Sequence, residues 1–378
     1  LNTPLADGIT AVDVIDDGTI SITLTEPNPA LLFSLGGPLG IMASPDALDN
    51  PDLATVPVGS GPYTLDASRT TVGAEYVFTR REGEFWDAES WAYDTIDVKI
   101  VPDITARVNG LMSGEFDGAN VQPATAEQIK GSDLTLLEIP AGFLGLGIFD
   151  RAGELQPAFA DLRVRQAVNY ALDRDALLEA IQFGYGTVSQ QLFGPDFEGY
   201  DPSIDETYTY DVEKAKELMA DAGYADGFEI SMPDFGGGGS ALTLLQQSLG
   251  EIGIRVTLDA VAPTEIYDAL FGKKYPMFLA AQTGDPWNQI STILLPDGQW
   301  NMWNSTDPEL DALLEIGRAA GPDERQDAFA DINRRAIENA WFAVIYQQTD
   351  LYALQNDVTA QTGVGNNVPL LWTFAPAE

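Results

Sequence analysis

Hydrophobic and polar residues alternate with the period of a β-strand in several short segments of the first 121 residues. Apolar side chains alternate at residues 10–14 and 20–24, on either side of the turn dipeptide Asp17-Gly18, and this arrangement predicts a β-hairpin. The same alternation predicts further strands, and apolar positions at helical spacing predict a helix. The expected strands are 63–65, 76–79, 96–101 and 116–121, and the expected helix is 104–112.

Beyond residue 160 the apolar positions recur with the period of an α-helix. In segment 163–172, Val164, Ala167 and Val168 fall on one face, which is typical of a helix packed against a core. Asp173 and Asp211 stand where the N-caps of the following two helices are expected. Toward the end of the chain the pattern predicts helices at 308–316 and 324–339 and a strand at 342–346.

The segment between residues 228 and 281 has the pattern of a β-α-β-α-β unit. The expected strands are 228–232, 254–258 and 277–281, with one helix opening at Ser240 and another at 264–271. Helical crossovers of this kind place strands parallel, and open parallel sheets bind ligands beyond the carboxyl ends of their strands. The loops 233–239 and 282–287 leave the sheet at that edge. The pattern therefore nominates Asp285 and Trp287 as ligand-binding residues.

Composition narrows the possible functions. The 378 residues carry 19 Lys and Arg against 58 Asp and Glu, a formal net charge of −39, and such a field disfavours binding to nucleic acid. Histidine and cysteine are absent. Their absence excludes the usual zinc sites, Cys or His nucleophiles, Ser-His-Asp triads and haem held by His or Cys. The length and the 45% hydrophobic content indicate a globular protein of two or three domains.

Nothing in the sequence has the length and apolarity of a membrane span. The most apolar short stretch, residues 143–149, falls far below the roughly 20 residues that a transmembrane helix needs. The chain opens at Leu1 without a methionine, so we expect it to be a fragment or a processed form.

Six segments, in order along nearly the whole chain, resemble the family 5 extracellular solute-binding proteins, the dipeptide, oligopeptide and nickel type that serve ABC importers. The segments are Gly59-Ser-Gly-Pro-Tyr63, Glu84-Phe-Trp86 with the Tyr93-Asp-Thr-Ile-Asp97 that follows it, Val101-Pro-Asp-Ile-Thr-Ala-Arg107 with its continuation to Asp117, Val164-Arg-Gln-Ala-Val-Asn-Tyr-Ala-Leu-Asp-Arg174, Tyr210-Asp-Val-Glu-Lys-Ala-Lys-Glu-Leu-Met-Ala-Asp-Ala-Gly-Tyr224, and Asn304-Ser-Thr-Asp-Pro-Glu-Leu-Asp-Ala-Leu-Leu314. Most motif residues, such as Arg107 and Arg165, are expected to fix turns or helix packing.

The resemblance implies an α/β protein with the two-lobed fold of type II periplasmic binding proteins, in which mixed sheets are flanked by helices and a hinge joins the lobes. It implies that residues 58–142 and 346–378 form lobe one, that residues 1–57 end an extra subdomain of lobe one, and that residues 143–345 form lobe two. The family has a long stretch before the position of Leu1, so we expect the chain to be incomplete at its N-terminus.

The function that the resemblance implies is solute capture for an ABC importer. A peptide-like or oligosaccharide-like small solute would bind in a cleft between the lobes and pass to the transmembrane permease subunits. We expect a monomer outside the cytoplasm, periplasmic or lipid-anchored at the outer face of the bacterial membrane, that binds no nucleic acid, uses no cofactor and is not an enzyme.

The resemblance also implies ligand-binding residues. Gly284 and Asp285 align with the family loop whose Asp pairs with the amino terminus of a bound peptide, although an Asp before Pro286 also suits an ordinary turn. Gly238 lies in a glycine-rich loop where dipeptide-binding members carry an Arg. Aromatic side chains in segments that flank the family cleft would stack on the solute or belong to the core, and these are Trp287, Trp300, Trp303 and Tyr346. Phe143 lies where the chain crosses between the lobes, and we expect it to line the hinge.

The sequence also contains features of a metal site and of an enzyme. Residues 13–18 resemble the start of a calcium loop, but Ile15 occupies a position that needs an oxygen ligand, so we expect no metal site. A carboxylate-dependent hydrolase of the glycosidase kind is the alternative function, because a pair of acids and tryptophans in a cleft are all that its chemistry requires.

Overall fold

The computed structural model describes residues 8–53, 55–83, 91–236, 239–363, 366 and 368–377. The chain divides into two compact units. Unit 1 comprises Leu1–Leu32 and Pro140–Thr349, and unit 2 comprises Phe33–Ile139 and Asp350–Glu378. The assignment of residues to the lobes of the family stays a prediction.

Unit 2 contains an antiparallel sheet in the order β3-β4-β5, formed by Tyr63–Leu65, Glu75–Arg80 and Thr95–Lys99. Strand β6 (Gly118–Val121) pairs with residues 351–354 of β12 and is flanked by the helices α2 (Ile104–Met112) and α3 (Pro123–Lys130). Two short strands, β13 (Val358–Thr359) and β14 (Ala375–Pro376), also pair. These elements match the strands and helix expected before residue 122.

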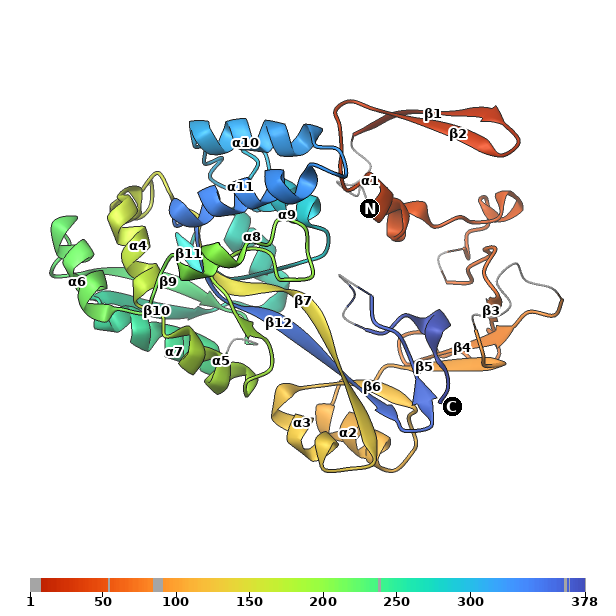
Figure 1. Ribbon diagram of the computed structural model, residues 1–378. Coiled ribbons are helices and arrows are strands. Elements are labelled where there is room, and N and C mark those ends of the chain that lie inside the picture. The colour runs from red at the N-terminus through yellow and green to blue at the C-terminus, as the bar shows by residue number, and fades with distance from the viewer. Residues whose placement is uncertain are drawn as a thin grey trace. The chain divides into compact units, whose positions relative to one another are not determined.

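Unit 1 is built on a sheet whose strands are β11 (Met277–Thr283), β7 (Leu134–Ile148) and β12 (Phe342–Gln355), with the short β8 (Thr187–Val188) beside β12. Because neighbouring side chains of a strand point to opposite faces, each strand contributes to two cores. In β12, Phe342 and Val344 belong to one core and Ala343 and Ile345 to the other. Figure 1 shows α10 and α11 on one side of β7 and β12, and α5 and α7 on the other.

The first core lies under the helices of the C-terminal third of unit 1. These are α8 (Ile266–Phe271), α9 (Pro286–Ile293), α10 (Pro308–Ala319) and α11 (Arg325–Glu338). Helices α10 and α11 approach closely at Gly317, where a Cβ would lie 2.6 Å from the side chain of Ile332.

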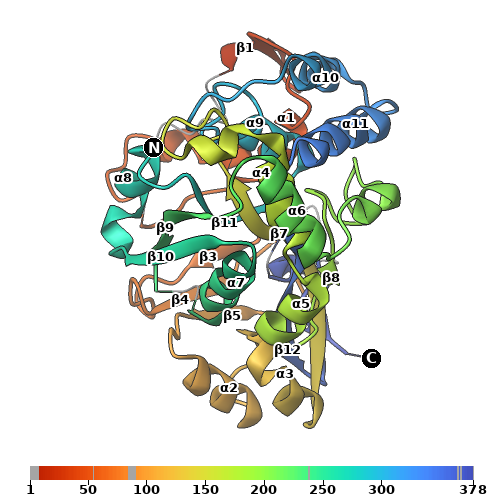
Figure 2. The ribbon, with the colours of Figure 1, turned by 90° about the vertical axis from the view of Figure 1, so that its left-hand side faces the viewer.

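The second core lies between the sheet and a layer formed by α4 (Leu162–Tyr170), α5 (Arg174–Gln182), α6 (Val212–Asp221), α7 (Gly239–Glu251) and the parallel pair β9 (Phe228–Asp234) and β10 (Ile254–Ala260). Figure 2 shows α7 beside β10. Asp173 and Asp211 cap α5 and α6 by accepting the backbone N–H groups of Ala176 and Lys214. Both predicted caps are confirmed.

The expected β-α-β-α-β unit is correct only for its first two strands. Strand β11 pairs antiparallel with β7, from Met277 opposite Ile148 to Thr283 opposite Gly142, and not with β9 or β10. The close approach depends on glycine, because a Cβ at Gly142 would lie 1.8 Å from the carbonyl oxygen of Gln282. The partner strand lies about 130 residues upstream, so no pattern within 228–281 indicates it.

The predicted hairpin is confirmed. Strands β1 (Ile9–Asp16) and β2 (Thr19–Leu24) pair antiparallel, and the Asp16 carboxylate accepts the N–H of Gly18 within the turn. After the hairpin comes the short helix α1 (Leu31–Leu35). Short 3-10 helices lie at Pro38–Gly40, Pro45–Ala47, Pro157–Ala160, Pro202–Glu206, Pro263–Glu265 and Leu371–Thr373. The motif segment 84–86 lies outside the described residues.

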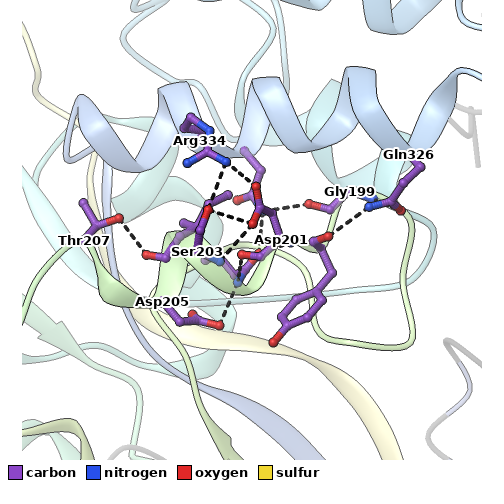
Figure 3. A network of polar contacts seen from close by, with 11 residues as sticks. Gly199, Asp201, Ser203, Asp205, Thr207, Gln326 and Arg334 are labelled. Atoms are coloured by element: carbon purple, nitrogen blue, oxygen red, sulfur yellow. Dashed lines mark hydrogen bonds and ion pairs between the residues drawn. The ribbon is translucent and has the colours of Figure 1, made fainter.

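A polar network joins segment 199–207 to α11 (Figure 3). Gln326 accepts the N–H of Gly199 and donates to the carbonyl of Tyr200, while Arg334 forms an ion pair with Asp201. Deeper in the same region, the fully buried Asn333 accepts the N–H of Leu192 at 3.0 Å. These contacts hold segment 199–207 against α11.

Candidate functional site

A pocket of about 220 Å³ opens in unit 1 where β9 and β11 end. Phe235 directly follows β9, and Gln282 lies near the end of β11, so both loops that the sequence placed at the ligand edge contribute to the wall. The residues that line the pocket are Phe149, Phe235, Ile266, Tyr267, Leu270, Phe278, Leu279, Ala280, Ala281, Gln282, Ile293, Trp300 and Phe342.

The floor of the pocket is a cluster of three buried phenylalanines. Phe149 stacks on Phe278 with their ring centroids 4.2 Å apart, and Phe342 meets Phe149 edge-on at 6.2 Å. The Phe149 ring lies over Gly147, where a Cβ would be 2.4 Å from it. Glycine at position 147 therefore leaves the space in which the Phe149 ring lies against Phe278.

The rim is formed by aromatic side chains that remain partly exposed. Tyr267 and Phe271 lie one turn apart on α8, and both approach Trp300, with centroid distances of 6.3 and 5.3 Å. Tyr267 is 61% exposed. Such rings present an apolar face to a ligand while keeping contact with water.

A buried cation lies behind the floor. The guanidinium of Arg151 is centred 4.0 Å from the ring centroid of Trp341, and 5.8 and 5.5 Å from those of Phe149 and Phe342. Its Nε donates to the carbonyl of Ile148 at 2.7 Å. Burial in this aromatic surrounding lowers the pKa of Arg151 well below its usual value. The rings of the floor thus separate the pocket from a positive charge.

Asp285 and Gly284 lie beside the pocket but do not line it. Gly284 turns the chain with φ of +97°, a conformation that suits glycine. Asp285 is the N-cap of α9, and its carboxylate accepts the N–H of Asn288 at 3.1 Å. Burial raises the pKa of Asp285, while the hydrogen bonds from Asn288 and Trp287 and the charge of Arg325 oppose this shift. The carboxylate thus has a structural role, and its ligand-binding role stays a prediction.

The other nominated residues divide between the pocket and the core. Trp300 lines the pocket. Trp287 is buried against Phe329, with centroids 5.9 Å apart, and Trp303 is buried with the Lys273 ammonium 5.7 Å from its ring centroid. Both belong to the first core, which favours the alternative that they serve packing.

Phe143, Tyr346 and Gly238 complete the set. Phe143 is fully buried edge-on to Phe342, one of the floor rings, at 5.7 Å. Tyr346 is fully buried too, and its hydroxyl accepts a hydrogen bond from Gln182 at 3.2 Å, while burial raises its pKa to about 12. Gly238 lies outside the described residues.

Most of the pocket was missed by reasoning from sequence. Phe278 and Phe342 lie on β11 and β12, and Phe149 directly follows β7. These positions are far apart in the chain, and no local pattern brings them together. Tyr267 and Phe271, however, carry a readable signal. Two aromatic residues four positions apart share a face of a helix, and the exposure of this pair on α8 marks the rim.

The pocket suits binding better than catalysis. Among the described residues that line it, none is acidic or basic, and polar side-chain atoms come only from Gln282, Tyr267 and Trp300. Within the same described ranges no group of three or more Asp and Glu residues is placed to hold a metal ion. The arrangement can enclose an apolar group and offer a few hydrogen bonds at its edge.

Comparison with known proteins identifies the family of this chain. Residues 2–302 match the model of the bacterial extracellular solute-binding proteins, family 5 Middle. The chain is 30% identical over 270 residues to the glutathione-binding protein GsiB of Salmonella choleraesuis strain SC-B67, covering 68% of this chain and 50% of GsiB. It is 34% identical over 230 residues to heme-binding protein A of Haemophilus influenzae, covering 58% of this chain and 40% of that protein. The chain spans about half the length of the curated relatives it matches.

Among solved structures, the chain is similar to the periplasmic binding protein DppA of Helicobacter pylori in complex with the peptide STSA. The TM-score is 0.81 at 21% identity, over 99% of this chain and 76% of that one. This likeness confirms the expected fold, that of type II periplasmic binding proteins with mixed sheets flanked by helices. With the family model matching most of its length, the chain belongs to the bacterial extracellular solute-binding proteins of family 5.

Proposed function

We propose that this protein captures a small solute outside the cytoplasm and delivers it to the transmembrane subunits of an ABC permease. Family membership supports the role, and the aromatic pocket at the ends of β9 and β11 provides a place for the solute. The pocket is the single observation that carries the proposal, because it is preformed, concave and lined mainly by apolar side chains, as small-molecule sites commonly are.

The solute we propose is peptide-like or oligosaccharide-like. Two relatives support the peptide-like class by what they bind, since GsiB is named for glutathione and DppA holds a tetrapeptide. In such a complex the carboxylate of Asp285 would accept a hydrogen bond from an ammonium group of the solute while it also caps α9. Trp300 would stack on the solute from the rim.

We propose that the protein works in the periplasm or tethered to the outer face of the membrane, as a monomer. The description of the family as extracellular supports this location. Across the described part of the chain, none of the helices combines the length and the apolarity that crossing a bilayer requires.

The hydrolase alternative has no support. The family and the relatives named above are binding proteins, and the described lining of the pocket supplies no carboxylate that could act as acid or nucleophile. We therefore propose a binding protein that releases its solute unchanged.

A thermal-shift screen tests the proposal. The chain is heated with free peptides, oligosaccharides and other small solutes, each at several concentrations. A true solute raises Tm progressively with its concentration, because it binds the folded state only, and mass spectrometry recovers it intact. Recovery of cleaved product at catalytic turnover, or no Tm rise with any solute class, would contradict the proposal.

A further inference from the structure

We infer that the aromatic pocket takes an uncharged aromatic group of bicyclic size, carried by the solute or bound alone. The inference rests on the proposed function for its biological meaning. Its physical basis lies in the charge, the size and the shape of the pocket. The charge favours a neutral group, the size favours more than one ring, and the shape favours a flat group.

The charge of the lining selects for a neutral group. None of the described lining residues carries a formal charge, and a buried ion without a partner is strongly disfavoured. The Arg151 guanidinium lies directly behind Phe149 and Phe342, 5.8 and 5.5 Å from their ring centroids. A cationic group in the pocket would therefore lie near a buried guanidinium, with no acidic side chain in the described lining to pair with it.

The size of the pocket selects for more than one ring. An apolar protein cavity of about 150 Å³ accommodates a single benzene molecule, and this pocket measures about 220 Å³. A methyl or hydroxymethyl group would leave much of the aromatic floor without contact. Two fused rings fill the space better, and contact with the walls is what stabilises an apolar ligand.

The shape of the walls selects for a flat group. The floor rings Phe149 and Phe278 are stacked nearly parallel, with an interplanar angle of 16°. At the rim, Trp300 is tilted by 41° to Tyr267 and faces solvent only in part. A planar aromatic group can meet these rings in offset-stacked and edge-to-face contacts, whereas a puckered sugar ring meets only part of them.

Three probes that share one ring system test the charge and size requirements. Indole is neutral, tryptamine adds an ammonium group, and indole-3-carboxylate adds a carboxylate. Their dissociation constants for the chain are measured by saturation-transfer NMR titration. We expect indole to bind at least tenfold more tightly than either charged probe, and benzene to bind more weakly than indole.

Two variants tie the binding to this pocket. Ala280 shares a face of β11 with Phe278 and packs on the first core, so Ala280→Phe places a ring inside the pocket. This variant should weaken the binding of indole at least tenfold. Ala220→Phe, on the exposed face of α6, should leave the affinity for indole unchanged. Trp300→Ala removes a ring from the rim and places no new side chain inside the pocket. It should weaken the binding of indole about fivefold, and it still tests the inference if Ala280→Phe does not fold.

Equal affinity for indole and tryptamine, or indole binding unchanged in both Ala280→Phe and Trp300→Ala, would overturn the inference. The two proposals fail separately. Selective indole binding with no Tm rise from any solute in the screen would leave the pocket chemistry standing and remove the transport role. A solute that binds while indole does not would leave the transport role and remove the aromatic preference.

Discussion

Asp285 accepts the backbone N–H of Asn288 at 3.1 Å and thereby caps the first turn of α9. The residue that the sequence nominated as a ligand anchor is thus also part of the scaffold beside the pocket. The cap that the structure shows and the ligand contact that stays a prediction can be separated by mutation, because asparagine and alanine remove different parts of the chemistry of the carboxylate.

Replacing Asp285 should separate capping from charge. Asparagine caps helices about as well as aspartate, and alanine at an N-cap costs about 0.5–2 kcal/mol. We therefore expect Asp285→Ala to lower the free energy of unfolding by about 1 kcal/mol and Asp285→Asn to change it little at pH 7. Urea denaturation measures both. A large loss with asparagine would show that the charge itself, not the cap, is needed for folding.

The ion pair of Asp307 and Arg335 should make stability depend on pH. Arg335 Nε lies 2.8 Å from one oxygen of Asp307, and this contact, more than any other, lowers the pKa of Asp307. An acid with a lowered folded-state pKa stabilises the fold above its unfolded-state pKa, near 3.8, and loses this contribution as pH falls through the folded value.

Asp307→Asn keeps the cap of α10 but loses this charged pair. It should cost about 1.5–3 kcal/mol at pH 7, the value of a hydrogen bond to a charged group, and the cost should shrink as pH falls through the lowered folded-state pKa. Urea titrations between pH 2 and 7 in high salt measure the difference. Glu309→Gln, whose carboxylate also reaches Arg335 but is 69% exposed, is the control and should change stability by less than about 1 kcal/mol. A pH-independent loss in Asp307→Asn would contradict the assignment.

Arg174 should not tolerate lysine. Its guanidinium is buried and donates to the carbonyls of Val344 at 2.7 Å and Asn169 at 3.2 Å, and to the side chain of Asn169 at 3.0 Å. Burial lowers its pKa to about 10. The ammonium group of lysine cannot donate to these separate acceptors as the planar guanidinium of arginine does. Each buried acceptor left without a partner costs about 1–3 kcal/mol.

We expect Arg174→Lys to cost at least about 2 kcal/mol in urea denaturation, on that scale for unpaired buried groups. The matched control is Arg163→Lys, because Arg163 is exposed and pairs with Asp161 at the surface. That variant should lose less than about 1 kcal/mol. Equal losses in the two variants would contradict a packing role for Arg174.

Gly147 should resist even a methyl group. A Cβ there would lie 2.4 Å from the ring of Phe149, so the ring must move away from Phe278. Overpacking of this kind lowers the free energy of unfolding by about 1–3 kcal/mol. The displaced Phe149 ring should also weaken the binding of indole. Gly250→Ala is the control, because nothing lies within 4 Å of its Cβ on α7 and alanine favours helices. A stable Gly147→Ala variant with unchanged indole affinity would contradict the described floor.

Local patterns predicted the local elements well. The hairpin β1–β2 followed from alternation around Asp17-Gly18, and the caps Asp173 and Asp211 followed from their place before apolar stripes. Each depends on residues within a few positions of one another, so the sequence carries the whole signal. Arg107 and Arg165 likewise serve packing as expected, through hydrogen bonds to backbone carbonyls.

Long-range pairing was beyond the same reasoning. Strand β11 has the alternation of a strand, but nothing in it indicates that it pairs with β7 instead of β10. The pocket could not be predicted for the same reason, because Phe149, Phe278 and Phe342 come together only when β11 pairs with β7. The sequence therefore nominated Asp285 and Trp287, which follow β11 beside the pocket but do not line its wall.

Native mass spectrometry of the chain with a mixture of dipeptides and maltooligosaccharides tests the central claim, that an intact solute binds in the aromatic pocket. The account predicts a one-to-one complex that carries the mass of an uncleaved solute, preserved in Ala220→Phe and lost in Ala280→Phe. A complex equally abundant in both variants, or an adduct with the mass of a hydrolysed solute, would contradict it.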